Sequence, residues 1–359
     1  TCPVRGHSNV QGDRTMGIWE KPKDVFLDNL EKEFSFKAPR KHGYDVVSAI
    51  EAMDQKKATV FIGMGGNFIS ATPDTEFTAK AMQQCSLSVQ ISTKLNRSHL
   101  IHGKKALILP CLGRSEKDIQ SSGEQFITVE NSMGIVHQSK GHLVPHSNLL
   151  LSEPAIVAGL AKATLKNTTT DWSGMAANYD LVREKIEATI PGFQKYNQRV
   201  RIPGGFTLPN NARENDFTPT ATGKANFSSN KPSAIPLENH QFLMMTIRTH
   251  DQYNTTIYGL NDRYRGVLNE RRIIFMNAED MEQHGLQKLD KVNLTSHFNG
   301  EERHALDFLV VPYNIPRQCT ATYFPETNVL VPITSKADIS NTPTSKTVVI
   351  SIQKETANL

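Results

Sequence analysis

A polar segment late in the chain holds a dense group of side chains that could bind a ligand. Residues 247–266, IRTHDQYNTTIYGLNDRYRG, contain three Arg, one His, two Asp and one Gln, and few apolar residues. Arg and His suit phosphate, while Asn, Gln and Thr suit the donors and acceptors on the edge of a heterocycle. A solvated hairpin is the structural alternative, but so many groups able to form paired hydrogen bonds favour a ligand.

A glycine-rich turn follows an apolar stretch in the first third of the chain. In GMGGNFISATPD, residues 63–74, glycines would let backbone N–H groups approach a ligand closely, and a following helix N-terminus would favour an anion. The segment is neither G-x-G-x-x-G nor a P-loop, because no Lys follows. A tight strand-to-helix turn without a ligand remains the alternative.

The opening segment TCPVRGHSNVQGDRTMG, residues 1–17, is a third candidate. Arg5 could hold a small carboxylate by a bidentate hydrogen bond, although most single Arg side chains are simply exposed at the surface. His137, His142 and His146 do not have the spacing of a zinc signature, and we assign no metal ligands. The chain begins without Met, and we expect an internal start, such as a proteolytic fragment or a processed product.

Composition limits the class of protein. The chain has 359 residues, 38% hydrophobic and 21% charged, with a net charge of +4, which fits a globular protein of two or three domains. So small a charge predicts no nucleic-acid partner, and no apolar run is long enough to span a bilayer. The four Cys form no C-x-x-C pair, so we expect reduced thiols of a cytoplasmic protein.

The first part of the chain alternates between strand and helix patterns. Short apolar runs at 58–64, 87–92 and 106–110 are typical of buried strands, with helices expected over 44–53 and 73–84 and from Ser152. Thr72 and Pro73 suit the N-cap and first position of the helix over 73–84. Residues 45–164 therefore predict a parallel, doubly wound sheet.

The rest of the chain changes character twice. Residues 166–240 are rich in Pro, Gly and Asn, and predict a long wrapping connection with one helix near 179–190 rather than a domain core. From 241 onward, apolar runs, including those near 319–324 and 328–332, predict strands. A hairpin is expected at Asn299-Gly300 and a short helix after Asn277, and together these elements predict a compact β-barrel.

Several segments, in order along the chain, resemble the molybdopterin-guanine-dinucleotide oxidoreductases, and the formate-dehydrogenase-like alpha subunits in particular. The similar segments are PVRGHSNVQGDRTMG, FIGMGGNFISATPD, ALILPCLGRSE, VENSMGIVHQSKG, FTPTATGKANF, RTHDQYNTTIYG and YFPETNVLVP. No one motif is strong alone, but the match runs from residue 1 to the end.

The resemblance implies a fold and a division into domains. The fold class would be α/β plus β: half of a split doubly wound α/β domain, a long connection, and a C-terminal six-stranded β-barrel of the double-psi type. Residues 1–165 would be the returning half of the molybdopterin-binding domain, 166–235 the connection, and 236–359 the dinucleotide-binding barrel. The missing N-terminal part would carry the metal-ligating residue and the cysteines of a 4Fe-4S cluster, so the chain alone would be inactive.

The resemblance also implies a cofactor and the residues that bind it. The cofactor would be bis-molybdopterin guanine dinucleotide with molybdenum or tungsten, and Arg5 would act as the catalytic residue that orients a small anionic substrate. The implied cofactor-binding residues are Gly65, Gly66, Asn67, Ser92, Thr93, Asn96, Arg248, Thr249, His250, Gln252, Tyr253, Asn254, Thr255, Asn328 and Lys346.

Two departures from the family pattern qualify this reading. Ala106 stands where relatives often have an acid that contacts guanine, and Arg14 replaces a small residue near the presumed active centre, which puts formate as the substrate in doubt. The sequence thus predicts part of a molybdopterin oxidoreductase that works with its missing N-terminal part and an electron-transfer partner. The alternative is a non-catalytic scaffold of the same fold that acts in partner binding or cofactor handling.

Overall fold

The computed structural model describes residues 9–231 and 234–355. Their contacts divide the chain into two compact units, one with residues from Thr1–Gly43 and Pro110–Lys231 and one with residues from Tyr44–Leu109 and Pro232–Leu359. The domain boundaries at 165 and 235 follow from the family resemblance and not from contacts within the chain. They stay a prediction. In the described part of the chain, no helix is both long enough and apolar enough to cross a membrane.

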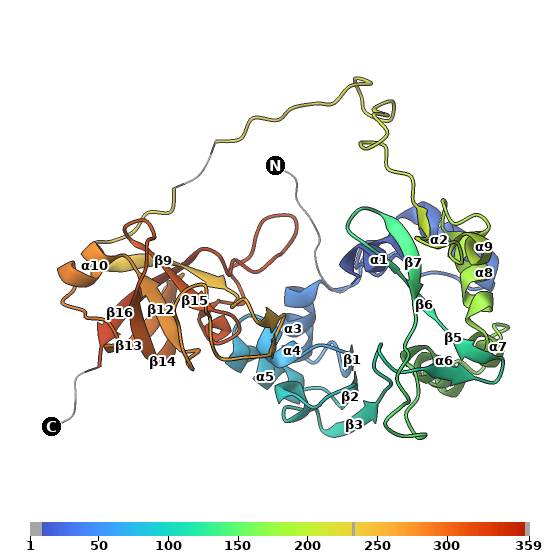
Figure 1. Cartoon of the computed structure of the whole chain (residues 1–359), viewed down its shortest axis with the longest axis horizontal. Helices are drawn as coiled ribbons and strands as arrows, with labels where there is room; N and C mark the ends of the chain where they lie inside the picture. The colour runs from blue at the N-terminus through green and yellow to red at the C-terminus, as the bar shows by residue number, and fades with distance from the viewer. Residues whose placement is uncertain (1–8, 232–233, 356–359) are drawn as a thin grey trace. The chain divides into compact units, whose positions relative to one another are not determined.

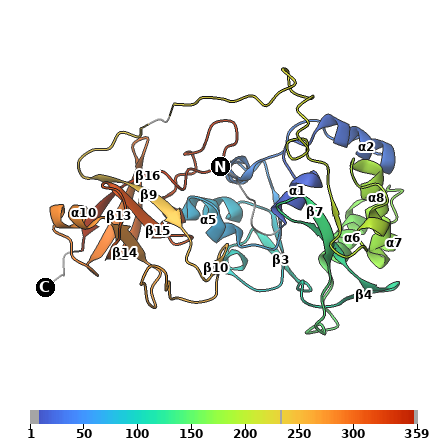
Figure 2. The same cartoon turned by 45° about the horizontal axis from the view of Figure 1, so that its top comes forward.

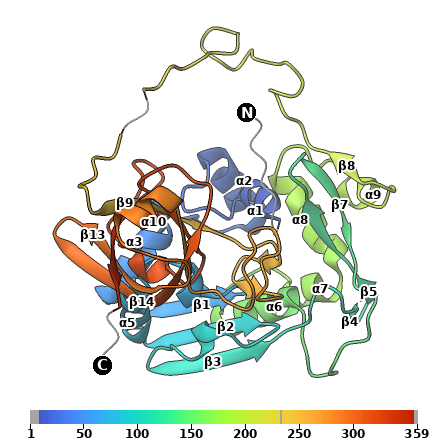
Figure 3. The ribbon, with the colours of Figure 1, turned by 60° about the vertical axis from the view of Figure 1, so that its left-hand side comes forward.

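The second unit contains the three strands expected in the first third of the chain, but the expectation that all three are buried was wrong, because most residues of the first and third of these strands are exposed among the described residues. They lie side by side in the order β1-β2-β3 (Figure 3), with bounds Val60–Met64, Leu87–Ser92 and Lys105–Pro110. β1 and β2 are parallel, in register from Val60 opposite Leu87 to Met64 opposite Ile91. Since parallel strands end at the same edge of a sheet, the residues after β1 and after β2 are brought together.

Short helices follow or precede these strands: α3 (Val46–Asp54), α4 (Phe68–Ala71), α5 (Thr75–Gln83) and the 3₁₀ turn η1 (Arg97–His99). Val47, Ile50, Ile69 and Met82 from these helices are fully buried in one cluster. The expected helix start at Thr72 and Pro73 was wrong, because α4 ends at Ala71 and Asp74 is the N-cap of α5. Tertiary bonds made by Asp74, described below, fix this start.

The C-terminal strands of the second unit form a closed ring. The pairing order is β12-β14-β13-β16-β9-β15, and β15 pairs back onto β12, so the expected barrel with six strands is present (Figure 1). The bounds are β9 (Gln241–Ile247), β12 (Ile273–Met276), β13 (Lys291–Phe298), β14 (Glu301–Pro312), β15 (Cys319–Tyr323) and β16 (Val348–Lys354). A small ladder of β10 (Gln252–Tyr253) and β11 (Thr256–Ile257) follows β9.

Local sequence signals explain the connections in the barrel. Asn299 and Gly300 both have positive φ, 52° and 78°, as a two-residue hairpin turn requires, and they join β13 to β14. Asn277 caps α10 (Ala278–Gln283) by accepting a bond from the Glu279 N–H, as expected. The strand expected over 328–332 was wrong, because a 3₁₀ turn, η2 (Asn328–Leu330), begins there instead.

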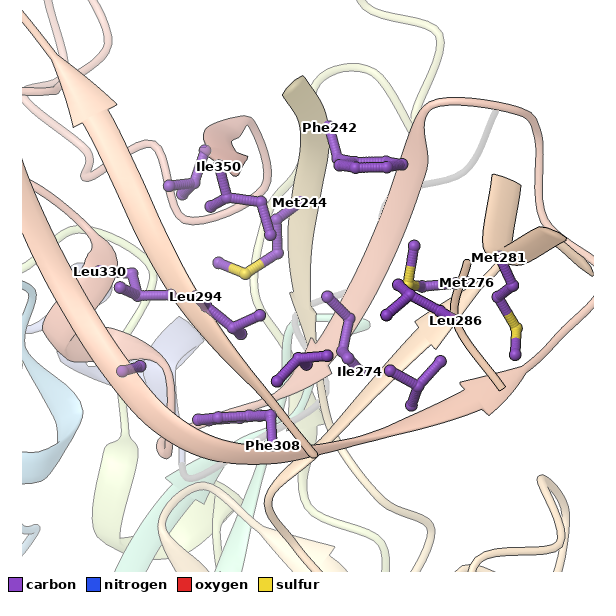
Figure 4. Packing of buried hydrophobic residues seen from close by; sticks show 14 of the residues in the cluster. Phe242, Met244, Ile274, Met276, Met281, Leu286, Leu294, Phe308, Leu330 and Ile350 are labelled. Carbon is purple, nitrogen blue, oxygen red and sulfur yellow. The ribbon is translucent and has the colours of Figure 1, made fainter. Parts of the chain in front are cut away.

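Alternating side chains fill the barrel interior. In β9 every second residue is buried, so Phe242 and Met244 join Ile274, Leu294 and Phe308 from three other strands in one apolar cluster (Figure 4). Burying each such side chain contributes about 1.5–3 kcal/mol relative to exposure. The barrel therefore has its own core, which supports the polar loops at its strand ends.

The first unit combines antiparallel hairpins with helices (Figure 2). Its elements are α1 (Val10–Thr15), α2 (Asp24–Phe34), β4 (Asp118–Gln120), β5 (Gly123–Gln125), β6 (Ile127–Glu130), β7 (Ile135–Ser139), α6 (Glu153–Thr164), α7 (Trp172–Ala177), α8 (Tyr179–Thr189), α9 (Tyr196–Arg199) and β8 (Phe206–Thr207). β4 pairs with β5 and β6 with β7, both antiparallel. The expectation of one parallel sheet through residue 164 therefore fails after β3.

The segment expected to be a connection without a core is partly folded. Phe193, Tyr196, Val200 and Phe206 are buried and pack with Val136 of β7. Aromatic rings make this possible in a stretch rich in Pro and Gly, since Phe193 lies 4.7 Å from Tyr196 between ring centroids. No helix and no strand lies between β8 and residue 231, so only residues 208–231 form the connection without regular structure that the sequence predicts.

Candidate functional site

The glycine-rich turn begins directly at the end of β1. Gly65 and Gly66 have φ values of 66° and 69°, in the left-handed region where glycine has no steric penalty, and the Gly65 N–H donates to the Ile91 carbonyl of β2 at 2.8 Å. A Cβ added to either glycine would meet nothing within 4 Å. The backbone conformation therefore demands glycine here, while the space in front of the turn is open to a ligand.

Hydrogen bonds tie this turn to the loop after β2. The Asn96 side-chain amide donates to the Gly66 carbonyl at 2.7 Å, and its oxygen accepts the Ser98 N–H at 2.9 Å. The buried Ser98 hydroxyl donates to the Asn67 side chain at 3.0 Å and accepts the Ile69 N–H at 3.0 Å. The structure thus brings Gly65, Gly66, Asn67 and Asn96 to one edge of the sheet, and Ser98 is the residue that sequence reasoning missed.

The remaining residues of this loop have different surroundings. Ser92 ends β2 and donates to the Lys94 carbonyl at 2.8 Å, and Thr93 is exposed. His99 accepts the Asn96 N–H at 3.0 Å, which completes a capping box of η1. The pattern Asn96-x-x-His99 was the signal in the sequence that could have located this turn.

The positive φ values of the turn give a stability prediction. Gly65→Ala or Gly66→Ala is expected to lower the free energy of unfolding by about 1–2 kcal/mol, because a Cβ penalises the left-handed conformation. Gly159→Ala is the control, since Gly159 lies within α6, has equally open space and no left-handed φ, and should change stability by less than about 1 kcal/mol in the favourable direction. Urea denaturation measures all three, and equal effects would contradict the assigned turn.

A buried arginine organises the segment that follows β9. The Arg271 guanidinium is only 7% exposed and donates to the Glu326 carboxylate at 2.7 and 2.9 Å and to the Phe324 carbonyl at 2.8 Å. It also donates to the Thr249 hydroxyl at 3.1 Å and the Gln252 side chain at 3.2 Å. Arg271 lies 22 residues after Thr249 and 19 residues after Gln252, so the pattern around residue 250 did not indicate it.

The side chains of Thr249, Gln252 and Asn328, three of the predicted residues, already form hydrogen bonds within the protein. The Gln252 amide donates to the Asn254 carbonyl at 2.8 Å and to the Phe324 carbonyl at 2.7 Å, and its oxygen accepts the Thr249 N–H at 3.1 Å. Asn328 is buried and donates to the Ser70 carbonyl at 2.7 Å. The structure therefore gives Thr249, Gln252 and Asn328 a structural part, and their predicted contact with a cofactor stays a prediction.

Two cations stand near each other at the strand ends of the barrel. Lys346, just before β16, donates to the Thr246 carbonyl of β9, and the pKa of its amine is lowered, first by burial and second by the positive charge of Arg248. The Arg248 guanidinium lies 5.3 Å from the centre of the Phe324 ring. Among the described residues, no carboxylate lies within 4.0 Å of either cation. This unbalanced charge suits a phosphate.

The lowered pKa of Lys346 gives a prediction with a definite sign. Because the unfolded chain holds this proton more tightly, stability should rise with pH in the window between the lowered pKa and the ordinary value of 10.5. Arg248→Met should raise the pKa of Lys346 only part of the way back, since burial is the larger cause. NMR titration of the isotope-labelled Cε methylene groups of lysine measures this pKa, and an unchanged value in the variant would show that the two cations do not interact.

A cleft of about 890 Å³ within the second unit joins the two groups of predicted residues. Asn67 and Arg97 line it from the sheet edge, and Thr255, Arg271 and Arg272 line it from the barrel. Glu76, Glu270, Asp307 and Glu326 also line it, so donors and acceptors are mixed. Such a lining suits the edge of a heterocycle better than a bare polyanion.

The other predicted residues do not line this cleft. His250 stacks against Tyr264 with ring centroids 4.3 Å apart, and Asn254 has a φ of 50° at the turn between β10 and β11. Tyr253 is exposed in β10. Arg5 lies outside the described residues. Among the residues that are described, no group of three or more His, Cys, Asp or Glu side chains could hold a metal ion.

Comparison with known families gives a match for the residues of the barrel. A family model described as the molydopterin dinucleotide binding domain matches residues 242–349, from β9 into β16. The C-terminal part of this chain matches the model of a molybdopterin dinucleotide binding domain. The sequence-based resemblance to molybdopterin oxidoreductases is therefore confirmed, and the segment after β9, with Arg248 and Gln252, lies within the matched residues.

Relatives extend the likeness along the whole chain. An uncharacterized oxidoreductase of Mycobacterium tuberculosis (strain ATCC 25618 / H37Rv) is 50% identical over 358 residues, which is 98% of this chain and 46% of the relative. Protein YdeP of Escherichia coli (strain K12) is 42% identical over 360 residues, 98% of this chain and 47% of the relative. The chain thus spans about half the length of these curated relatives.

A solved structure shares the fold. Acetylene hydratase from Pelobacter acetylenicus superposes with a TM-score of 0.56 at 10% identity, over 96% of this chain and 50% of that chain. At this identity the likeness concerns the fold alone. The predicted α/β-plus-β class is confirmed at this level.

Proposed function

We propose that the intact protein is a molybdopterin-dependent oxidoreductase of the formate-dehydrogenase-like kind. It would bind bis-molybdopterin guanine dinucleotide with molybdenum or tungsten, and carry out a two-electron redox reaction on a small anionic substrate. Support comes from the family match of residues 242–349 and from a relative 50% identical that is named an oxidoreductase. The double-psi form of the barrel, the split α/β domain and the cytoplasmic location are part of the same proposal.

The observation that carries the proposal is the pair of cations Arg248 and Lys346. Both belong to the dinucleotide-binding domain, they are close enough for Arg248 to lower the pKa of Lys346, and neither has a carboxylate partner among the described residues. A dinucleotide carries a pyrophosphate, whose charge would balance this pair. The residues present therefore fit the phosphate part of the implied cofactor.

The second unit also fits the remainder of the dinucleotide. Gly65 and Gly66 leave open space where a ligand can approach backbone groups, and the cleft between Asn67 and Thr255 offers donors and acceptors to a heterocycle. Glu76 and Glu326, which line that cleft, supply acceptors of the kind that the N–H groups of guanine need, although Ala106 lacks one. When bound, the cofactor supplies the metal-centred two-electron chemistry, and the chain supplies position and charge.

Metal and nucleotide content test this function. In protein purified from a host that makes the cofactor, we expect about one molybdenum or tungsten atom and about two guanine nucleotides per chain after acid hydrolysis. A cytosine nucleotide in place of guanine would contradict the guanine form. Protein that holds the dinucleotide yet shows no turnover with any formate or oxyanion donor would favour the non-catalytic scaffold.

A further inference from the structure

A second cavity, of about 230 Å³, lies wholly within the first unit and is separate from the dinucleotide-binding residues. Its walls come from α1, β6, β7, α8 and the segment around α9. Most of the lining is apolar and includes Met16, Phe126, Val136, Val182, Ile186 and Phe193. A cavity of about 150 Å³ with such walls can hold a benzene ring, so this one has room for a ring and a short substituent.

One acidic side chain lines this apolar cavity. Glu130, the last residue of β6, is 6% exposed, and its backbone N–H donates to the Asn9 side chain at 2.8 Å. Its Oε2 atom has no contact with solvent and no hydrogen-bond partner among the described residues. A buried carboxyl oxygen without a donor costs free energy, so it calls for a partner inside the cavity.

Three other polar side chains of the cavity, from Thr128, Arg183 and Tyr196, already form hydrogen bonds within the protein. The Tyr196 hydroxyl and the Thr128 hydroxyl share a hydrogen bond of 2.7 Å. Arg183 donates to the Asn197 side chain at 2.6 Å and to the Phe126 carbonyl at 3.1 Å, and forms an ion pair with Asp180. Neither pair supplies a donor to Glu130, so the cavity offers an acceptor and an apolar wall.

We propose that this cavity binds a small organic ammonium ion with an apolar body. The N–H donors of an ammonium group would satisfy Oε2 of Glu130 and balance its charge, while the apolar body would fill the space beside Phe193 and Val136. An anion would be repelled, and a neutral hydrocarbon would leave the acceptor unpaired. This proposal does not rest on the oxidoreductase function, because the dinucleotide-binding residues lie in the other unit.

Calorimetric titration of the purified protein with benzylammonium, benzyl alcohol and benzoate tests the proposal. We expect saturable binding of benzylammonium, weaker binding of the alcohol and none of benzoate. Glu130→Gln should weaken benzylammonium binding by at least about 10-fold, the share expected for a charge-assisted bond. Glu184→Gln is the control, because Glu184 is an exposed carboxyl on α8. This variant should bind benzylammonium with the same affinity as the parent.

A second variant keeps the test decisive if Glu130→Gln does not fold. Val182→Phe places a larger side chain in the cavity wall and retains Glu130, and it should abolish benzylammonium binding. Equal affinity in Glu130→Gln and the parent, or no saturable binding in the parent, would overturn the proposal. A crystal structure of the protein with benzylammonium in which ordered waters remain bound to Glu130 would overturn the proposal as well.

Discussion

Removing Arg248 and Lys346 together, as Arg248→Met with Lys346→Met, is expected to lower the molybdopterin content of the purified protein at least about 100-fold, since each charge-assisted bond to a phosphate contributes about 1.5–3 kcal/mol. Neither cation has a carboxylate within 4.0 Å among the described residues, so their removal leaves no buried acid without its partner. The loss should therefore appear in cofactor content and leave folding intact.

The control for this variant removes the same charge elsewhere in the second unit. Lys57→Met with Lys288→Met replaces two exposed lysines and should leave cofactor content unchanged. Content is measured by the fluorescence of the oxidised pterin after extraction, beside the circular dichroism of each protein. A double variant of Arg248 and Lys346 that retains the parental content would remove the main support for the proposed site.

The largest expected loss of stability comes from Asp74→Asn, which should lower the free energy of unfolding by about 1.5–3 kcal/mol, because it removes the charge-assisted hydrogen bond to Arg303 and leaves that guanidinium paired with Glu301 alone. Asp74 is 6% exposed, and its carboxylate accepts from the Arg303 guanidinium of β14 at 2.8 Å. Its backbone N–H donates to the Asn328 carbonyl at 2.9 Å. One residue thus joins the start of α5 to the barrel, and it holds both sides of the cleft.

A matched control separates burial from backbone conformation. Asp307 also has a positive φ, 61° beside 47° for Asp74, and it pairs with Lys291 at 4.0 Å, with both side chains more than half exposed. Asp307→Asn should cost less than about 1 kcal/mol, because exposed pairs contribute little. Urea denaturation of the two variants gives the comparison, and equal losses would mean that the Asp74–Arg303 pair is not buried in solution.

Sequence patterns located most strands because each pattern was short and local. The run at β1 is apolar, β2 alternates apolar and polar residues, and the Asn299-Gly300 turn fixes one hairpin by its φ requirement alone. The hairpin β4–β5 was missed because most of its residues, such as Asp118 and Gln120, are polar, and the short hairpin β6–β7 was missed as well. In that stretch the pairing is set by tertiary contacts, for example the Tyr179 hydroxyl bonded to Asp118.

The candidate site was predictable in outline and not in its internal bonds. Glycines after an apolar strand can be recognised from the sequence, and the structure places them beside Asn67 and Asn96 as expected. Sequence alone could not show that Gln252 would bond to Arg271, or that Asn328 would reach Ser70, 258 residues away. Glu130 gave no signal either, because its lack of a partner is a property of the folded first unit.

Amide hydrogen exchange of the purified protein, measured with and without its molybdopterin cofactor, tests whether the loops of the second unit bind the dinucleotide. We predict slower exchange on loading at residues 65–67, 92–96 and 248–255, which are the segments proposed to contact the dinucleotide. Cofactor-loaded protein with unchanged exchange in all three segments would contradict the proposed site.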